Sequence, residues 1–276
     1  MNRLFYRIKK LKQKLIDRPL PEDTWISDRY HIKRVIGLGS FGITYLCRDQ
    51  ETRKLCVVKQ VKPSRRKDKA SIEMYENEVS IMKVLNHPAI PKFISSFQYK
   101  GHLFFAMDYV NGENIEDAIF AKGDRYREKE ALLFMEELLD IVEYIHSQGI
   151  IHRDIRLPNV IKADGNLFLI DFGLARFLHD QIHSDFENLE NYPVEKRLRR
   201  QNNVSSDFYA LGHFLLYLLY SSFESDSKDE QPWEQELNIT NLTKQMIKRM
   251  LQSEDAYHDI HELRNDLKHS LSNISS

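Results

Sequence analysis

Cysteine is scarce in this chain, and neither sign of charge dominates. Cys47 and Cys56 are the only cysteines in 276 residues, which excludes a disulfide scaffold and favours a reducing compartment. Lys and Arg total 40 against 41 Asp and Glu, a formal net charge of −1, so the composition indicates no nucleic-acid partner. A hydrophobic share of 42% with 29% charged residues excludes a disordered or membrane-embedded chain.

Long hydrophobic runs are also missing. The first ten residues carry four basic side chains and lack the apolar stretch of a secretory signal, so we expect a cytoplasmic protein. The most apolar predicted helix, Phe208–Tyr220, is interrupted by Gly212 and His213 and is too short to span a bilayer. We therefore expect it to be a buried core helix.

Residue patterns predict strands in the first part of the chain and helices in the second. Predicted strands are Tyr30–Gly37, Thr44–Arg48, Leu55–Val61, Phe93–Tyr99 and Leu103–Asp108. Predicted helices are Lys69–Leu85, Glu128–Ser147, Phe208–Tyr220, Leu242–Leu251 and Asp259–Leu271. This order predicts a two-lobed α+β domain over 22–271, with a strand-rich N-lobe at about 22–108 and a helical C-lobe at about 112–271.

Residues 1–21 are predicted to form a separate N-terminal helix and linker. Apolar residues recur at 4-3-4 spacing from Leu4 to Leu15, and seven Lys or Arg residues fill other positions within 1–18. This pattern predicts a basic amphipathic helix that ends at the linker 19–21. Two roles stay open: peripheral contact with an anionic membrane surface, or packing of the apolar stripe on the strand-rich lobe.

The most informative segment runs from Ile151 to Asn159 and is followed by Asp-Phe-Gly at 171–173. Asp154 and Asn159 are five residues apart, and Asp171 lies 17 residues past Asp154. Two short apolar runs between them flank a turn at 164–166, which predicts a β-hairpin with an acid at each end. Such a layout suits Mg²⁺ binding by an amide and a carboxylate while a second carboxylate orients a hydroxyl, as phosphoryl transfer from a metal–nucleotide complex requires.

The motifs His-Arg-Asp at 152–154, with Asn five residues past the Asp, and Asp-Phe-Gly-Leu-Ala-Arg at 171–176 resemble those of eukaryotic-like (Hanks-type) protein kinases, particularly small soluble bacterial ones. The resemblance covers about Tyr30 to Leu267 and implies ATP and Mg²⁺ as cofactors and a protein substrate. It implies that Asp154 is the catalytic base and that Asn159 and Asp171 bind Mg²⁺.

Two loop positions bear on specificity within this resemblance. Arg156 stands where serine/threonine kinases usually have Lys and is implied to pair with the γ-phosphate. The tyrosine-kinase form of the loop has Arg where this chain has Pro158, so serine or threonine acceptors are favoured.

The strand-rich part carries the features expected to hold ATP. The glycine-rich segment at 37–42 is followed by a strand rather than a helix, which disfavours a dinucleotide-binding fold and matches the kinase phosphate loop. Lys59 is the one charge on an inward strand face, and Glu78 is the one charge on the inward stripe of the predicted helix. We therefore expect these two side chains to form an ion pair. Glu76 is the weaker candidate for the partner of Lys59. The resemblance implies nucleotide contacts at Gly37, Leu38, Gly39, Ser40, Phe41, Gly42, Thr44, Val57, Lys59, Met107, Asp108, Val110, Asn114 and Ile161.

Downstream of the Asp-Phe-Gly motif, the sequence resembles the kinase family less closely. Pro193-Val194-Glu195 occupies the position of the family's Ala-Pro-Glu motif, and Glu195 lies 12 residues before Asp207. The resemblance implies that Asp207 accepts hydrogen bonds from the backbone of the catalytic loop. The usual arginine partner of Glu195 is not evident, and His258 is the nearest residue in spacing. The activation segment contains no Thr and only one Ser, Ser184, which argues against activation by its phosphorylation.

Three charge runs remain, at 62–69, 196–200 and 224–236, and are typical of solvated loops or of docking sites. Two functional alternatives also stay open. One is a pseudokinase scaffold that binds nucleotide without turnover. The other is a small-molecule phosphotransferase on the same fold, which typically has His-Gly-Asp in the loop and lacks Asp-Phe-Gly. The oligomeric state is left open.

Overall fold

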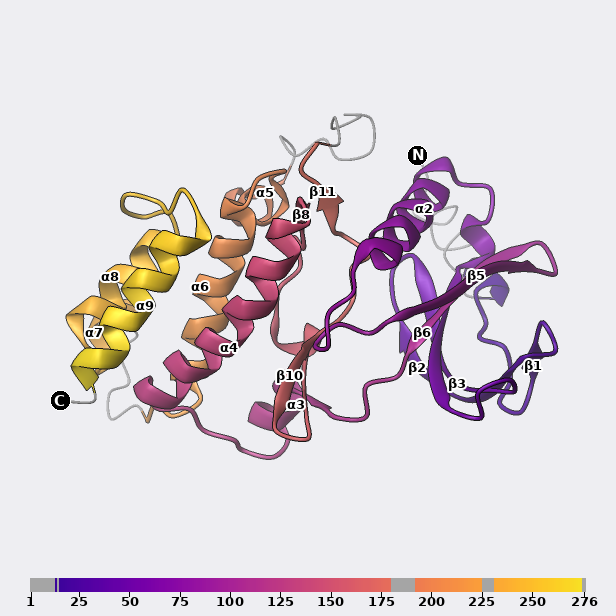
Figure 1. Cartoon of the computed structure of the whole chain (residues 1–276), viewed down its shortest axis with the longest axis horizontal. Coiled ribbons are helices and arrows are strands. Elements are labelled where there is room, and N and C mark those ends of the chain that lie inside the picture. Colours follow the sequence, from indigo (N-terminus) through magenta and orange to yellow (C-terminus); the bar gives the residue numbers. More distant parts are fainter. Residues whose placement is uncertain (1–12, 14, 180–191, 225–230, 275–276) are drawn as a thin grey trace, which may run out of the picture. The chain divides into compact units, whose positions relative to one another are not determined.

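The computed structural model describes residue 13 and residues 15–179, 192–224 and 231–274. The chain divides into two compact units: unit 1 contains 1–84 and 91–109, and unit 2 contains 85–90 and 110–276. Unit 1 is built on a β-sheet and unit 2 is mainly helical, as predicted (Figure 1). Most of the predicted N-terminal helix and the whole of 180–191, including Ser184, lie outside the described residues.

Unit 1 contains a six-stranded sheet in the order β1-β2-β3-β4-β6-β5, with every neighbouring pair antiparallel. Its strands are β1 Trp25–Ile26, β2 Tyr30–Leu38, β3 Gly42–Asp49, β4 Leu55–Val61, β5 Phe93–Tyr99 and β6 His102–Asp108. Alternating apolar residues of β2 and β3 point into a core that also includes Val58, Phe104 and Ala106. The five predicted strands are therefore confirmed, with their ends shifted by at most two residues.

Both cysteines lie in this core. Cys47 of β3 and Cys56 of β4 are cross-strand partners, and both are free thiols. Burial raises the pKa of the Cys56 thiol to about 12 and raises that of Cys47 as well. The thiols therefore stay protonated and pack as small apolar side chains.

One helix of unit 1, α2 Lys69–Val84, follows the short 3₁₀ helix η1 Pro63–Arg65. Its predicted inward stripe is confirmed: Glu78 and Met82 are buried, and the Tyr75 hydroxyl donates to the carbonyl of Phe104 at 2.8 Å. Glu76 is exposed. The helix thus presents a single carboxylate to the sheet.

The end of the N-terminal segment and the linker after it both contact other parts of unit 1. The Asp17 carboxylate accepts hydrogen bonds from the Ser64 amide and hydroxyl, both at 2.8 Å. The Leu20 amide donates to the Tyr45 hydroxyl at 3.1 Å, and that hydroxyl donates to Gln60 at 2.7 Å. These contacts fix the point at which the chain enters the sheet.

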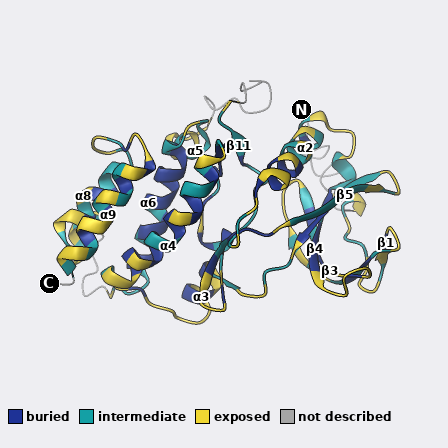
Figure 2. Ribbon diagram, viewed as in Figure 1, coloured by how far each residue is buried: buried dark blue, intermediate teal, exposed yellow. Residues whose placement is uncertain are grey.

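The helices of unit 2 are α3 Ile115–Phe120, α4 Glu128–Ser147, α5 Val194–Arg200, α6 Ser205–Tyr220, α7 Trp233–Glu236, α8 Asn241–Met250 and α9 Ile260–Ile274. Helices α4 and α6 have buried faces (Figure 2) and supply much of the core, so the prediction of α6 as a core helix is confirmed. None of the described helices is long and apolar enough to cross a membrane.

Short strands complete unit 2. They are β7 Glu113–Asn114, β8 Ile150–Ile151, β9 Val160–Ala163, β10 Asn166–Leu169 and β11 Arg176–Phe177, with the 3₁₀ helix η2 Leu157–Asn159 before β9. Strands β9 and β10 form the predicted hairpin, in which Val160 is opposite Leu169. The order β10-β9-β7 places residues 113 and 114 against this hairpin.

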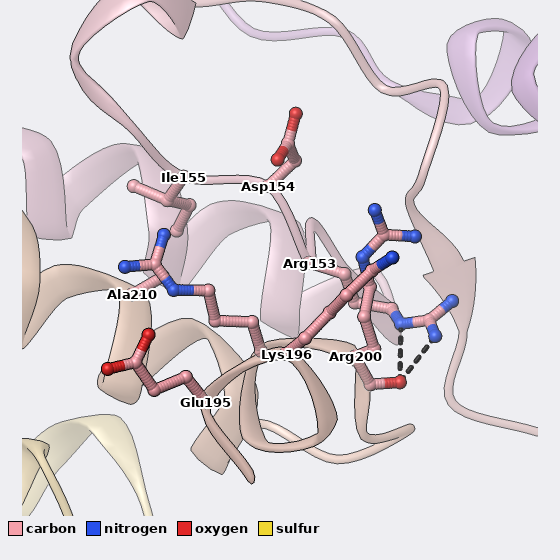
Figure 3. A pocket seen from close by; sticks show the side chains of 8 residues that line it. Arg153, Asp154, Ile155, Glu195, Lys196, Arg200 and Ala210 are labelled. Atoms are coloured by element: carbon pink, nitrogen blue, oxygen red, sulfur yellow. Dashed lines mark hydrogen bonds between the residues drawn. The ribbon is translucent and has the colours of Figure 1, made fainter. Parts of the chain in front are cut away.

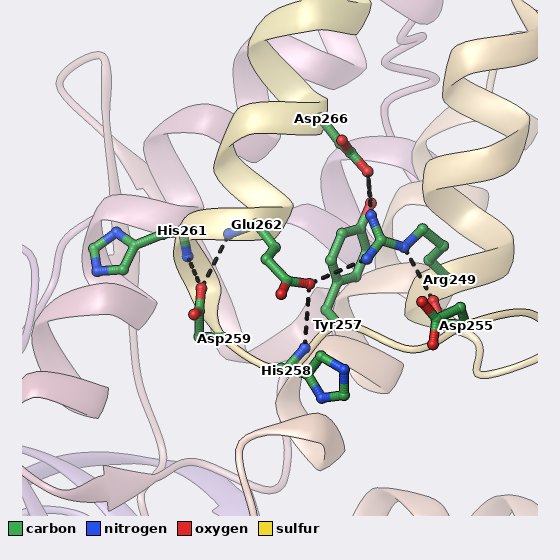
Figure 4. Close-up of polar contacts among 8 residues, drawn as sticks. All are labelled: Arg249, Asp255, Tyr257, His258, Asp259, His261, Glu262 and Asp266. Atoms are coloured by element: carbon green, nitrogen blue, oxygen red, sulfur yellow. Dashed lines mark hydrogen bonds and ion pairs between the residues drawn. The ribbon is translucent and has the colours of Figure 1, made fainter.

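An arginine joins α8 to α9 (Figure 4). The Arg249 guanidinium donates to Asp266 at 2.8 Å and to Glu262 at 3.1 Å, and its central carbon lies 4.0 Å from the centre of the Tyr257 ring. The Tyr257 hydroxyl donates to the same Asp266 at 2.6 Å. The His258 amide donates a long hydrogen bond to Glu262 at 3.4 Å, so this residue belongs to the α8–α9 cluster.

Candidate active site

The glycine-rich segment forms the turn between β2 and β3. The Gly39 amide donates to the Gly42 carbonyl at 3.0 Å, and Leu38 is opposite Ile43 in the ladder. A Cβ on Gly42 would lie 3.0 Å from the Gln60 carbonyl oxygen, so close approach to β4 favours glycine there. The strand predicted after the glycine-rich segment is confirmed, and the tip of this β2–β3 hairpin at 38–41 is exposed.

The predicted ion pair between Lys59 and Glu78 is present. Lys59 Nζ lies 2.5 Å from Glu78 Oε1, and the two side chains are only 17% and 12% exposed. The Lys59 ammonium also lies 5.7 Å from the centre of the Phe105 ring. A pair so shielded from water holds the ammonium in one position, because either charge alone would lack compensation there.

Two side chains that are expected to contact the nucleotide near its adenine base lie opposite each other in the sheet. Val57 of β4 and Met107 of β6 are cross-strand partners, and both are buried. The Asp108 amide donates to the Lys92 carbonyl at 2.9 Å, so this backbone group already has a partner. Val110 is the first residue of the second segment of unit 2. Their contacts with adenine stay predictions.

Asn114 has a structural role of its own. Its side-chain oxygen accepts from the Asp117 amide at 2.8 Å and its amide nitrogen donates to the Asp117 carboxylate at 2.7 Å, which caps α3. The β7–β9 pairing places Asn114 opposite Ile161. The nucleotide contact that the resemblance implies for Asn114 therefore stays a prediction, and capping already accounts for both polar atoms of its side chain.

Asp154 and Asn159 are joined in one loop of unit 2. Asn159 Nδ2 donates to the Asp154 carbonyl at 2.9 Å and to its carboxylate Oδ2 at 3.0 Å. The Ile170 amide donates to the Asn159 carbonyl at 2.9 Å, which places Asn159 beside the residue that precedes Asp171. The hairpin thus brings Asn159 and the start of the Asp-Phe-Gly motif together, as predicted.

A buried acid of α6 anchors this loop. Asp207 accepts hydrogen bonds from the amides of His152 at 2.9 Å and Arg153 at 2.7 Å, as expected from the sequence. His146 of α4, which the sequence did not single out, adds a third contact at 2.9 Å. Burial opposes ionisation of Asp207, but these contacts outweigh it and hold its pKa below the usual value. Their contribution to stability is present above about pH 3.9 and is lost as the pH falls further, through the lowered pKa.

Two residues of the site have a positive φ, a left-handed backbone conformation that is unfavourable for residues other than glycine. Arg153 has φ of 62° and Asp171 has φ of 64°. Each conformation costs on the order of 1 kcal/mol or more, so it persists only where surrounding contacts impose it. The Asp207 hydrogen bonds supply such contacts at Arg153.

The Arg153 side chain is buried and bonded to main-chain carbonyls. Its guanidinium donates to the Leu174 carbonyl at 3.3 Å and to the Arg200 carbonyl. It therefore links the catalytic loop, the segment after the Asp-Phe-Gly motif and the end of α5. These contacts depend on tertiary packing, and no local pattern in the sequence signals them.

Arg156 lies beside the candidate base. Its Nε is 3.3 Å from Asp154 Oδ2, while its side chain is 54% exposed. A pair this open to water is weak, so Arg156 can turn from Asp154 toward an anionic substrate at little cost. The implied contact with the γ-phosphate is compatible with this position.

Asn159 and Asp171 offer oxygen ligands suited to Mg²⁺. Within the described residues, the side-chain hydrogen bonds of Asn159 use only its Nδ2, which leaves Oδ1 to bind a cation. Asp171 Oδ1 accepts a long hydrogen bond from the Gly173 amide at 3.4 Å. Among the described residues no group of three or more His, Cys, Asp or Glu side chains could hold a metal. Mg²⁺ would therefore complete its shell with phosphate and water oxygens, as is usual for this ion.

A pocket of about 170 Å³ adjoins Asp154 (Figure 3). Its lining residues are Arg153, Asp154, Ile155, Glu195, Lys196, Arg199, Arg200 and Ala210. Glu195 is exposed there and, within the described part of the chain, forms no ion pair. The partner of Glu195, which the sequence leaves open, is therefore not found among the described residues.

Four histidines that are buried or partly buried make stability depend on pH. Burial is the main cause of a lowered pKa at His87, His102, His152 and His213. Since unfolded histidine titrates near about pH 6.5, the unfolded state gains protons below that value that the folded state resists. We expect the free energy of unfolding, measured with urea, to fall from about pH 7.5 to about pH 5.5.

His213→Leu should make this fall shallower, because it removes one partly buried titrating group whose pKa is lowered by desolvation. His258→Leu is the control at an exposed position and should leave the dependence on pH unchanged. Stability that is flat or rises on acidification over this range would contradict the prediction.

An acid and an amide in one loop, anchored on a buried carboxylate, are what phosphoryl transfer from a metal–nucleotide complex requires. The fold and site thus define a phosphotransferase. Residues 30–274 match the family described as protein kinase domain, and the chain belongs to that family.

Similar proteins agree with this assignment. The probable serine/threonine-protein kinase YbdM of Bacillus subtilis is 35% identical over 268 residues, covering 97% of this chain and 99% of that protein. Serine/threonine-protein kinase B of Synechocystis is 28% identical over 253 residues, 82% of this chain but only 44% of that one. The solved PknI kinase domain of Mycobacterium tuberculosis superposes with a TM-score of 0.68 over 91% of this chain and 100% of that one, at 20% identity. The predicted kinase-like α+β fold is confirmed.

Proposed function

We propose that this chain is a serine/threonine protein kinase that transfers the γ-phosphoryl group of ATP to a protein hydroxyl with Mg²⁺. The observation that carries the proposal is the Asp154–Asn159 hydrogen bond in a loop anchored on Asp207. The serine/threonine names of the relatives and the Pro158 position support the choice of acceptor.

Each residue has a distinct part in this proposal. Asp154 orients the acceptor hydroxyl and accepts its proton, while Lys59, fixed by Glu78, binds the α- and β-phosphates. Asn159 and Asp171 would hold Mg²⁺, which neutralises phosphate charge when bound. Arg156, once released from Asp154, would pair with the γ-phosphate.

Transfer of label from γ-labelled ATP tests this function. We expect label on the protein itself or on a generic protein substrate, and its loss when EDTA removes Mg²⁺. Nucleotide binding without transfer would favour a pseudokinase scaffold. Transfer only to small metabolites would favour a small-molecule phosphotransferase.

Activity should not depend on phosphorylation of the activation segment. The segment has no Thr, and the Arg153 guanidinium is bonded to the backbone carbonyls of Leu174 and Arg200. We expect Ser184→Ala to retain most of the wild-type turnover of a protein substrate. A collapse of turnover that Ser184→Asp restores would contradict this prediction.

For location, we propose a cytoplasmic protein whose N-terminal segment packs on unit 1 rather than on a membrane. The Asp17 and Leu20 contacts support packing, because they fasten the adjoining linker to the sheet and to η1. Deletion of 1–18 should then lower thermal stability, and the full chain should not bind anionic vesicles. Vesicle binding that the deletion abolishes, with unchanged stability, would instead support a peripheral membrane contact.

A further inference from the structure

The pocket beside Asp154 is strongly basic (Figure 3). Four of its lining side chains are cationic, namely Arg153, Lys196, Arg199 and Arg200, against two anionic ones, Asp154 and Glu195. Three of the cations come from α5, where the run 196–200 contains four Lys or Arg residues. Helix α5 therefore places positive charge next to the candidate catalytic base.

Two of these cations are not neutralised within the described residues. Lys196 Nζ lies 3.6 Å from the centre of the Tyr192 ring, and no described acid forms an ion pair with Lys196 or Arg199. Arg153, in contrast, is buried and donates to backbone carbonyls. Lys196 is exposed and Arg199 is partly exposed, so both can reach a bound ligand.

We infer that these two side chains select protein acceptors with carboxylates close to the phosphorylated hydroxyl, an inference that rests on the proposed function. Asp154 itself lines the pocket. A peptide whose hydroxyl lies on Asp154 advances at most about 3.6 Å per residue, so residues within about three positions of the acceptor fall within reach of the pocket. Asp154 and Glu195 are the two opposing charges of the pocket lining.

The expected preference is moderate and sensitive to salt. Each partly exposed cation should change kcat/KM for an acidic acceptor by about two- to fivefold, mainly through KM. Because the charges are open to solvent, the preference should shrink as ionic strength rises.

Three synthetic peptides with one serine test the inference. One has neutral residues around the serine, one has Asp within three positions on both sides, and one has Lys at those same positions. We expect kcat/KM to decrease in the order Asp, neutral, Lys. Lys196→Ala and Arg199→Gln should each weaken the preference, whereas Arg197→Ala should preserve it, because this exposed cation of α5 does not line the pocket.

Charge reversal gives a result that misfolding cannot imitate. Lys196→Glu should raise kcat/KM for the Lys peptide while lowering it for the Asp peptide. If the neutral peptide is phosphorylated but charge has no effect, or if Arg197→Ala acts as strongly as Lys196→Ala, the inference is wrong and the proposed function stands. If neither a peptide nor a protein accepts phosphate, both fail.

Discussion

Asp154→Asn should abolish phosphoryl transfer while ATP binding stays nearly unchanged. The substitution keeps the size of the side chain but removes the carboxylate that orients the acceptor and takes up its proton. Loss of a general base typically lowers the rate by about 10²- to 10⁴-fold. Turnover of a protein substrate and nucleotide affinity should be measured on the same preparation.

Asp171→Asn should behave differently, because Asp171 is proposed to act on the metal. Its Mg²⁺-dependent ATP binding should be lost together with turnover. Asp164→Asn, in the exposed turn of the same hairpin, is the matched control. Since Asp164 has φ of 49°, asparagine suits that position and should leave activity unchanged.

Wild-type turnover in Asp154→Asn would show that the assignment of the loop 152–159 as the catalytic loop is wrong.

Removal of either partner of the Lys59–Glu78 pair should have the second large effect. Lys59→Met and Glu78→Gln should each lower kcat/KM by about 10²-fold or more, since one loses the phosphate-binding ammonium and the other its fixed position. Breaking a shielded ion pair also leaves an uncompensated charge, at a typical cost of about 3–5 kcal/mol when fully buried and less here. Urea unfolding alongside kinetics separates the two effects.

Glu76→Gln is the control on the same helix. Glu76 is exposed while Glu78 is buried against the sheet, so the control should retain both activity and stability. A loss in Glu76→Gln equal to that in Glu78→Gln would contradict the assigned role of the pair.

The long periodic elements of the fold could be predicted because a single face of each is buried. Helix α4 has the predicted bounds, Glu128–Ser147, and its buried residues follow the apolar pattern of the sequence. The burial of residues along β4 follows the strand alternation less closely. Strand alternation places Leu55 on the same inward face as Lys59, but Leu55 is 40% exposed, and Cys56 and Val58 on the opposite face are buried. Alternation fails there because both faces of β4 are covered.

Short elements and tertiary contacts could not be predicted. Helix α3 has only six residues and depends on the Asn114 cap, and α5 is dominated by basic residues that give no apolar period. The site was found from its motifs, because Asp154, Asn159 and Asp171 have fixed spacing. Their supports, such as the bond from His146 to Asp207, join residues 61 positions apart, and no local signal indicates them.

The identity of the phosphorylated residue tests the central claim most directly. A generic protein incubated with ATP and Mg²⁺ should carry phosphate on serine or threonine when wild-type enzyme is present, as located by mass spectrometry. The same sites should be unmodified with Asp154→Asn. Phosphate on tyrosine alone, or no phosphate despite demonstrated ATP binding, would contradict the account.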